Sequence, residues 1–403
     1  MQVIEWESSI KIYINKKQFD DLLKKINIIA TDSIIYFTDN TRLAHRLYQK
    51  KILKKKEYIL LYHKKNFFPI KRSISEEDLL PRPNMESLVI KNAISRNILY
   101  QDSFVRINLD VERTDIGNKY CLCSEIEYEE DSSYSTIRLQ ETKLVSFFLK
   151  FLKEKNLINL LTLDNLTTND IFESVPNKMS MWYNLQKNEK KYWAYKWNGV
   201  KAKMCSSDFG KKITLWEDIK NIIEIQCTEL YKRLPFLNNL CIQLEHVNDY
   251  YVLTEILSAK FNSRFYMIEP LTNIKLLYLI KKKWDDSIEL LPNKRLYIQE
   301  YFDTEIPNSY DESKFDGFIV IQNEKILKYK IPTIDMKCIK GTLYSVSSKK
   351  FTLDFEGIPG KIYEVSSTFK VLRLRKDRIS SGSDKEYEEF VKGCIYFNKY
   401  CKK

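Results

Sequence analysis

The chain has 403 residues, of which 44% are hydrophobic, and its formal net charge is +12. This length suits two or three domains, and the hydrophobic content excludes an intrinsically disordered chain. The eight cysteines form no Cys-x-x-Cys pair and there are three histidines, which excludes the usual structural zinc sites. No apolar run could cross a bilayer and we expect no signal peptide, so the sequence predicts a soluble protein. A basic surface favours nucleic acid as a partner.

The first third of the chain is predicted to be mostly strand. β-branched and aromatic residues alternate or cluster in four segments, at residues 3–14, 58–62, 104–111 and 120–128. Apolar residues then recur at helical spacing over residues 141–154, which predicts a helix. The polar stretch at 162–177 is the predicted linker to the rest of the chain.

The remainder mixes strands with a few helices. Helices are predicted at residues 215–234, 273–284 and 385–393, and a Gly-Ile-Pro-Gly turn at 357–360. The sequence thus predicts a multidomain α+β fold. Its expected parts are a β-rich domain (1–165), an α/β domain (166–337) and a small β domain (338–403), the last about the size of an oligonucleotide-binding (OB) barrel.

Lys196 comes directly after a predicted strand at 192–195 and begins the run Lys-Trp-Asn-Gly-Val-Lys. A lysine can attack an α-phosphate and hold a nucleotide covalently if neighbouring cations and partial burial lower its pKa. Gly199 allows a tight turn beside a phosphate, and Lys201 supplies a second cation. The tetrapeptide alone is a common surface turn, and only the later segments of the chain give it a catalytic interpretation.

These later segments continue the same template in order. Glu245 lies on a predicted strand at 240–247, and a second predicted strand at 251–257 carries Glu255. Each later segment alone would be an ordinary turn, edge charge or solvated face, and it is their order and spacing that carry weight. These segments are Asp316-Gly317, Lys328-Tyr329-Lys330, Thr333–Met336 and the basic run Arg373–Arg378.

This series resembles the ordered motifs of the covalent nucleotidyltransferases, the mRNA guanylyltransferases and polynucleotide ligases, over residues 179–378. The resemblance implies that Lys196 is the nucleophile that takes GMP from GTP, and that Glu245 binds the ribose hydroxyls. Asp316 would help to hold a metal or a phosphate-bound water, and Lys328 and Lys330 would neutralise charge on the α-phosphate. Further residues implied to bind GTP or its phosphates are Asn198, Gly199, Lys201, Arg373, Arg375, Asp377 and Arg378.

The basic sixth motif is characteristic of capping enzymes and therefore favours GTP over ATP. Two features depart from the family pattern. Asn198 stands where most relatives have Asp, which keeps the hydrogen-bonding shape but drops the charge, and the usual glycine before Glu245 is missing. A Mg²⁺ or Mn²⁺ ion is expected with the triphosphate.

Glutamates recur at every second position at the start and the end of the predicted N-terminal strands. Because strand side chains alternate, those of each group share one face, and inside a closed barrel they would converge on divalent cations. The alternative is a polar outer face of a half-buried sheet. The implied metal ligands are Glu5, Glu7, Glu125, Glu127 and Glu129.

This acidic pattern resembles the tunnel-shaped, metal-dependent RNA 5′-triphosphatases of fungi and DNA viruses, in which Mn²⁺ or Mg²⁺ is held by two glutamate-rich strands. By that resemblance the basic residues that hold the triphosphate are Arg42, Arg46, Lys91 and Arg106. Cys123 stands where the family often has an arginine, which puts one phosphate contact in doubt.

Taken together, the chain is similar to the bifunctional capping subunits of baculovirus and nudivirus RNA polymerases, the fourth late expression factors. The resemblance implies removal of the γ-phosphate from triphosphate-ended RNA and then transfer of GMP from GTP to the diphosphate end. It also implies other viral RNA polymerase subunits as partners and the host nucleus as the location, with the cytoplasm as the alternative. Two other functions stay open, an ATP-dependent RNA or DNA ligase and a non-catalytic polymerase subunit.

Overall fold

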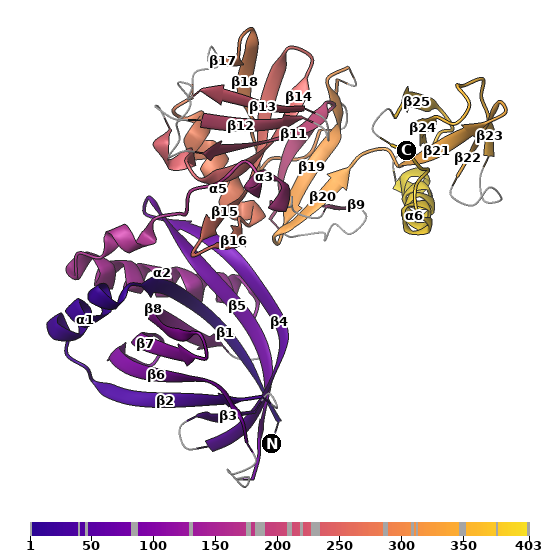
Figure 1. The fold of residues 1–403 in the computed structure, drawn as a ribbon. Helices are drawn as coiled ribbons and strands as arrows, with labels where there is room; N and C mark the ends of the chain where they lie inside the picture. The colour runs from indigo at the N-terminus through magenta and orange to yellow at the C-terminus, as the bar shows by residue number, and fades with distance from the viewer. Residues whose placement is uncertain are drawn as a thin grey trace.

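The computed structural model describes residues 2–400 except 39–40, 45–46, 82–87, 129–131, 175–178, 182–189, 208–211, 218–220, 227–233, 285–288, 308–309, 312, 346–351 and 376–377. Three predicted site residues, Arg46, Glu129 and Asp377, lie outside the described residues. Within the described ranges, no helix is both long enough and apolar enough to cross a membrane. The fold is mixed and rich in strands, as predicted (Figure 1).

A closed antiparallel barrel of eight strands forms the N-terminal part, which confirms the predicted barrel (Figure 1). Its strand order is β4-β3-β2-β6-β7-β8-β1-β5, and β5 closes the barrel by pairing with β4. The strands are β1 (Gln2–Ile14), β2 (Ala30–Phe37), β3 (Thr41–Ala44), β4 (Leu47–His63), β5 (Asn66–Leu79), β6 (Ile90–Gln101), β7 (Arg106–Thr114) and β8 (Gly117–Tyr128).

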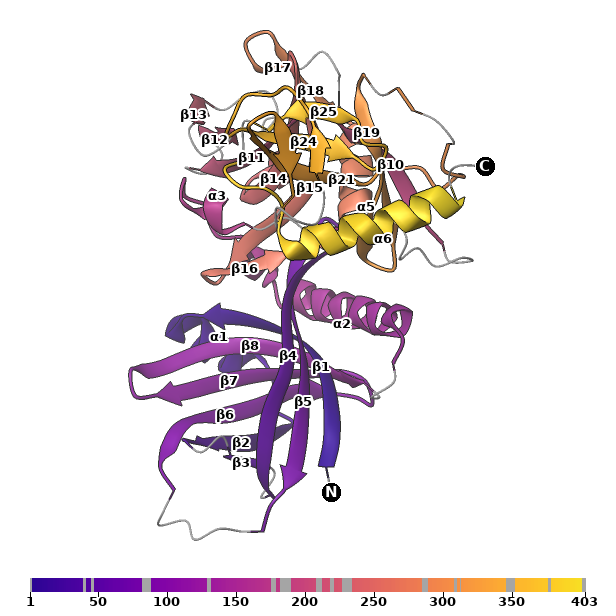
Figure 2. The ribbon, with the colours of Figure 1, turned by 90° about the vertical axis from the view of Figure 1, so that its right-hand side faces the viewer.

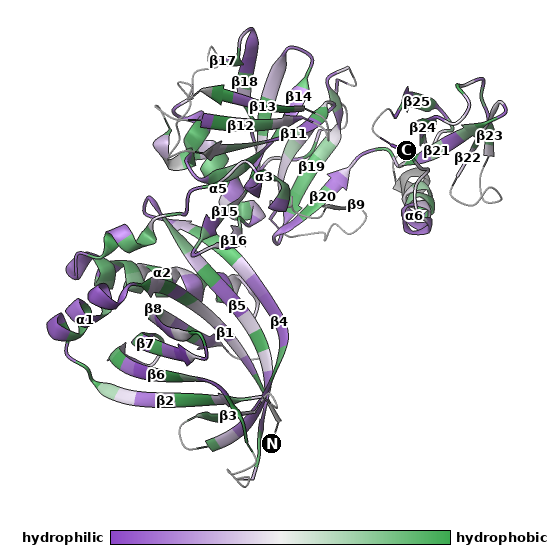
Figure 3. Ribbon diagram, viewed as in Figure 1, coloured by the Kyte–Doolittle hydropathy of each residue, from purple (hydrophilic) through white to green (hydrophobic). Residues whose placement is uncertain are grey.

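Hydrophilic and hydrophobic residues both recur along the strands of the barrel (Figure 3), and many of the residues that line its cavity are charged. On β1, Ile12 and Ile14 point away from the cavity and are buried, while Glu5 and Glu7 line it. Helices α1 (Lys16–Lys25) and α2 (Tyr134–Glu154) cover part of the outer face, and α2 lies between the barrel and the rest of the molecule (Figures 1 and 2). The predicted helix at 141–154 is the second half of α2. Helix α1 was not predicted, although Asn15 begins it with a capping box.

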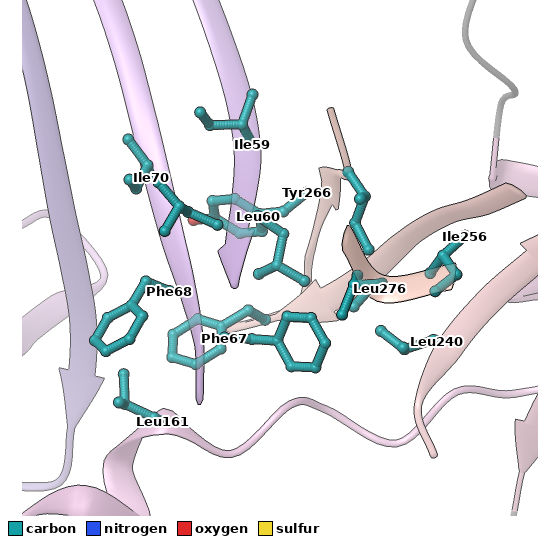
Figure 4. Close-up of a cluster of buried hydrophobic side chains, with 14 of the residues drawn as sticks. Ile59, Leu60, Phe67, Phe68, Ile70, Leu161, Leu240, Ile256, Tyr266 and Leu276 are labelled. Atoms are coloured by element: carbon teal, nitrogen blue, oxygen red, sulfur yellow. The ribbon is translucent and has the colours of Figure 1, made fainter. Parts of the chain in front are cut away.

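The β4–β5 hairpin joins the barrel to the central domain. Its tip carries Phe67 and Phe68, which belong to the same buried cluster as Leu240 and Leu276 of the central domain (Figure 4). The sheet is also continuous, because Ile59 of β4 pairs in parallel with Met267 of β16. The two parts therefore share one hydrophobic core.

A buried ionic cluster lies at the same junction. The Glu141 carboxylate of α2 is fully buried and accepts hydrogen bonds from Arg72 of β5 at 2.6 and 2.8 Å and from Ser8 of β1 at 2.9 Å. Arg72 also pairs at 2.5 Å with Glu269, which precedes the central helix α5, and Arg138 pairs with Glu269 at 2.7 Å. Charges at this depth are tolerated because each has an opposite partner.

The central domain contains a long antiparallel sheet and a small second sheet. The long sheet runs β13-β12-β11-β14-β15-β16, with β18 and β17 beside β15, and the small one runs β10-β19-β20-β9. Its strands are β9 (Met179–Met181), β10 (Tyr192–Trp197), β11 (Val200–Ser207), β12 (Lys212–Glu217), β13 (Asn221–Gln226), β14 (Leu240–Val247), β15 (Tyr250–Phe261), β16 (Arg264–Met267), β17 (Glu289–Leu291), β18 (Lys294–Ile298), β19 (Phe315–Gln322) and β20 (Lys325–Tyr329).

One expectation about this part is wrong. A helix was predicted at 215–234, but the regular structure described in this range is strand, in β12 and β13. Strand β12 buries the side chains of Ile213 and Leu215 and pairs with β11. Pairing with a neighbouring strand has overridden a local apolar spacing that suited a helix. The linker at 162–177 stays a prediction; within it, Leu166 and Ile171 are buried against residues of the central domain. The predicted helix at 273–284 corresponds to α5 (Pro270–Lys281).

The C-terminal part is a five-stranded sheet of order β23-β22-β21-β24-β25, followed by α6 (Asp384–Tyr400), which contains the predicted helix at 385–393. The first strand of this sheet begins at Thr333, before the predicted domain boundary at 338. The OB-fold assignment stays a prediction. These strands are β21 (Thr333–Ile339), β22 (Thr342–Tyr344), β23 (Thr352–Asp354), β24 (Ile362–Ser366) and β25 (Val371–Leu374).

The shared core makes a stability prediction. Phe68→Ala should lower the free energy of unfolding by about 3–5 kcal/mol, because the phenyl ring is fully buried between the two domains. Ile116→Ala is the matched control, since Ile116 lies in the β7–β8 turn and is 91% exposed. Denaturant unfolding followed by circular dichroism measures both. Equal losses in the two variants would contradict the shared core.

Two candidate active sites

The first candidate site is a cavity of about 360 Å³ between the central domain and the C-terminal sheet. Most of the nucleotide-site residues predicted from sequence line it, and they come from strands far apart in the chain. They are Lys196, Lys201, Glu245, Asp316, Lys328, Lys330, Arg373, Arg375 and Arg378. Asn198 is joined to this group through Arg373, whose Nη1 donates to Asn198 Oδ1 at 3.2 Å.

Lys196 owes its direction to an irregularity in its strand. The register of β10 against β19 shifts between Tyr195 and Trp197, and a bulge of this kind re-aims the side chain at its centre. Lys196 Nζ donates to Asp316 Oδ2 at 2.6 Å, and Lys330 Nζ reaches the same oxygen at 3.3 Å. One carboxylate oxygen therefore holds two ammonium groups.

Two glycines are required here by close approach of strands. Gly317 has φ +107°, and a Cβ on it would lie 2.5 Å from the Tyr329 carbonyl oxygen, so the residue after Asp316 must be glycine. A Cβ on Gly199 would lie 2.4 Å from the His246 carbonyl oxygen. The constraint on Gly199 thus comes from β14 as well as from the phosphate expected beside it.

Buried charge changes the acid–base behaviour of this cavity. Burial raises the pKa of Glu245 above its usual range, against the opposing effect of Lys196 and Lys201. Lys201 lies directly opposite Glu245 in the β11–β14 pairing. Burial, reinforced by Lys330 and the other lysines nearby, lowers the pKa of Lys328 to about 8. Lys328 is therefore the lysine here whose charge changes near physiological pH.

Glu364 of β24 is a site residue that the sequence did not reveal. It accepts from Thr333 Oγ1 at 2.7 Å and Arg373 Nε at 2.8 Å, and it contacts Lys330 Nζ at 3.4 Å. Burial alone would raise its pKa, but Lys330, Thr333 and Arg373 outweigh burial and lower the pKa to about 2. A lone acid in the apolar strand Ile-Tyr-Glu-Val-Ser was the available signal.

The other two described arginines of the basic run are also paired with acids. Arg375 and Arg378 contact Asp335 at 3.0 and 3.3 Å. Any phosphate that binds these guanidinium groups would replace Glu364 and Asp335 as their partner. Asp335 belongs to the motif segment at 333–336, whose spacing alone did not indicate a role for its carboxylate.

The second candidate site is the interior of the barrel, a cavity of about 400 Å³. The structure brings Glu5, Glu7, Glu125 and Glu127 to this cavity on the adjacent strands β1 and β8. Glu7 and Glu127 lie directly opposite each other in the strand register. In the described part of the chain neither has an ion-pair partner, so their charges repel unless a cation binds.

The other interior acids are matched by bases. Arg42 pairs with Glu77 at 2.7 Å, and Lys51 pairs with both Glu77 and Glu5. A second group joins Arg96 and Arg106 to Glu125 at 2.9 and 3.2 Å. Burial raises the pKa of Glu125, with Arg96 and Arg106 opposing the rise.

On β6 the structure places Arg96 at the cavity instead of the predicted Lys91. Lys91 is exposed and does not line the cavity. The pairing of β6 with β2 is irregular at Lys91, because the register shifts between Asn92 and Ile90. Lys51, Arg96 and Glu77 belong to no motif, so no signal in the sequence marked them. Cys123 lies near Cys121 and Asp110, and among the described residues these three form one group of possible metal-ligand atoms within 4.8 Å.

Comparison with models of known protein families gives a match. The family model for late expression factor 4 (LEF-4) matches residues 116–381, which is more than half of the chain. The RNA triphosphatase Pct1 of S. pombe is similar to it at 14% identity, covering 39% of this chain and 84% of that one with a TM-score of 0.25; this structure contains the Spt5 CTD. A second structure of Pct1 has 13% identity, the same coverage and a TM-score of 0.25.

A TM-score this low does not establish a shared fold, and no curated protein matches the chain. The family match stands by itself and spans β8, the central domain and most of the C-terminal sheet. It includes the residues that converge in the first cavity, from Lys196 to Arg378. The chain belongs to the late expression factor 4 family.

Proposed function

We propose that this chain is an mRNA capping enzyme with two active sites, a guanylyltransferase in the first cavity and a metal-dependent RNA 5′-triphosphatase in the barrel. Membership of the LEF-4 family supports a role in capping. The observation that carries the proposal is the contact between Lys196 Nζ and Asp316 Oδ2 at 2.6 Å, in a cavity that also holds Glu245, Lys328 and Lys330. A partly buried lysine paired with an acid among other lysines suits covalent nucleotidyl transfer.

In the first step Lys196 Nζ attacks the α-phosphorus of GTP. The nitrogen–phosphorus bond forms as the bond from that phosphorus to the bridging oxygen breaks, and pyrophosphate leaves. Before the attack, a proton passes from the Lys196 ammonium to Asp316 Oδ2, which already accepts a hydrogen bond from Nζ, so that Nζ has the lone pair that forms the new bond. Lys328 and Lys330 neutralise the charge that develops on the α-phosphate oxygens. Glu245 binds the ribose hydroxyls, and Gly199 and Lys201 lie beside the nucleotide.

In the second step a terminal phosphate oxygen of diphosphate-ended RNA attacks the same phosphorus. The bond to Nζ breaks, Lys196 recovers its proton, and the RNA carries the GMP group. Earlier, before pyrophosphate leaves in the first step, Arg373, Arg375 and Arg378 bind the outer phosphates of GTP in exchange for Glu364 and Asp335. Asn198 keeps Arg373 beside Lys196 through its side-chain oxygen.

The preceding reaction, removal of the γ-phosphate, takes place inside the barrel. Water attacks the γ-phosphorus of triphosphate-ended RNA, the bond to the bridging oxygen breaks, and inorganic phosphate leaves diphosphate-ended RNA. Glu7 and Glu127 fit Mg²⁺ or Mn²⁺, because within the described residues they oppose each other without a protein cation. When bound, such an ion supplies positive charge for the phosphates. Arg42, Arg96 and Arg106 orient the triphosphate. Glu125 keeps Arg96 and Arg106 in place, Glu77 keeps Arg42, and Glu5 keeps Lys51.

The covalent intermediate can be detected directly. Incubation with α-labelled GTP and Mg²⁺ or Mn²⁺ should leave label on the denatured chain, and Lys196→Ala should leave none. Lys190→Ala is the control, because this exposed lysine lies six residues away and does not line the cavity. Label that survives in Lys196→Ala would overturn the guanylyltransferase proposal, and labelling by ATP instead of GTP would favour a ligase.

The charge of Lys328 should appear in the pH dependence of labelling. Because the lowered pKa of about 8 keeps Lys328 charged below that pH, its stabilisation of the α-phosphate is lost as pH rises above it. Arginine stays charged at any such pH. The labelling rate of Lys328→Arg should therefore hold to a higher pH than that of the unmodified chain. If the labelling rates of both proteins fall at the same alkaline pH, Lys328 does not have this role.

The triphosphatase should depend on the opposed acids. Glu7→Ala and Glu127→Ala should each slow metal-dependent release of γ-phosphate from RNA by more than about 100-fold, because each removes a ligand. Labelling with GTP should persist in both. Asp115→Ala, at an exposed turn outside the cavity, should keep both activities. Unchanged phosphate release by Glu7→Ala would show that the metal binds elsewhere.

A further inference from the structure

Three cations of the barrel cavity have no carboxylate partner in the described part of the chain: Lys56, Lys71 and Arg264. The other lysines and arginines that line it are each paired with an acid. Those paired cations are Lys11, Arg42, Lys51, Arg96 and Arg106. Unpaired cations at a cavity wall are available to an anionic ligand.

Arg264 differs from the other two because it does not belong to the barrel. It begins β16 of the central domain, directly after the turn at Asn262 and Ser263. Asn262 Nδ2 donates to the carbonyl oxygen of Lys11 on β1 at 3.4 Å, and Arg264 Nη1 donates to the hydroxyl of Tyr58 on β4 at 2.5 Å. The turn is therefore attached to two strands of the barrel wall.

The three cations gather around Tyr58. The guanidinium carbon of Arg264 lies 4.3 Å from the centre of the Tyr58 ring, and Lys56 Nζ lies 5.1 Å from it. Lys71 is paired with Tyr58 in the register of β4 and β5. The cluster thus joins two barrel lysines to one arginine of the central domain.

Part of this cluster, Lys56 with Tyr58, lies where the barrel cavity meets a second cavity. Glu7, Lys56 and Tyr58 line the barrel cavity and also a second cavity of about 930 Å³ between the barrel and the central domain. An RNA whose 5′ phosphates lie at Glu7 must leave through an opening. At this opening its next phosphates would pass Tyr58 and the exposed guanidinium of Arg264. Arginine suits phosphate because its fixed donors match two oxygens.

We propose that Arg264 of the central domain binds the phosphodiester next to the 5′ triphosphate and so completes the RNA-binding mouth of the barrel. This inference rests on the proposed triphosphatase activity. Arg264 is a positioning residue: it holds the polynucleotide but does not touch the phosphate that is cleaved. A free nucleoside triphosphate has no such phosphodiester, and its hydrolysis does not depend on Arg264.

The test compares two substrates on the same variants. Arg264→Ala should raise KM for a short 5′-triphosphate RNA by about tenfold, the worth of one phosphate contact, with little change in kcat. Hydrolysis of free ATP or GTP should be unchanged. Arg264→Lys, which keeps the charge, should recover part of the affinity, and Arg113→Ala, an exposed arginine of β7 outside the cavity, should behave as the unmodified chain.

Binding gives a second measurement that does not need catalysis. The salt dependence of RNA affinity, measured by fluorescence anisotropy without metal, should fall in log–log slope by about one for Arg264→Ala. An equal loss for RNA and free triphosphate, or no loss for either, would overturn the inference. If the unmodified chain releases no γ-phosphate, the proposed activity fails, and the change in salt slope alone decides the role of Arg264.

Discussion

The rest of the structure depends on how the outside of the barrel is buried. A barrel that keeps charged side chains inside must bury its apolar residues on its outer face, and one eight-stranded wall cannot do so alone. Helix α2 and the central domain cover it, with Phe68 of the hairpin tip in the shared core. The buried Glu141, held by Arg72 and Ser8, fixes the contact, because either partner left alone at this depth would cost several kcal/mol. The barrel site and the central-domain wall of the first cavity thus share one hydrophobic core.

Both sites place like charges close together and balance them incompletely. In the first cavity four lysines surround two acids of the central domain. Burial, together with the charge of the other lysines, lowers the pKa of Lys328. In the barrel, Glu7 and Glu127 oppose each other without a described counter-ion. Such arrangements destabilise a fold unless a ligand of opposite charge binds, which is the expected physical signature of a site for a triphosphate or a divalent cation.

The order of the two proposed reactions fits the way the domains are joined. The barrel would make the diphosphate-ended RNA that the first cavity consumes, and the turn from Asn262 to Arg264 brings the central domain to the barrel opening. At the first cavity, Glu364 and Asp335 neutralise the arginines of the C-terminal part. They keep the arginines of the C-terminal sheet paired when no phosphate is bound, and this avoids a cluster of uncompensated cations.

The sequence by itself determined the motif series from Lys196 to Arg378, because the order of its segments can be read along the chain. It also determined the acidic strands of the barrel, because these depend on alternation along one strand. The tertiary structure decided what depends on distant neighbours. Strands β12 and β13 pair beside β11 although the apolar spacing from residue 215 onwards also suits a helix, and Arg96 faces the cavity where Lys91 does not. Glu364 and Arg264 belong to no motif, and their partners Lys330 and Tyr58 are distant in the chain, so their positions at the two cavities came from the tertiary structure. Side-chain direction and ion pairing are set by packing across the fold, and packing of that kind leaves no periodic trace in the sequence.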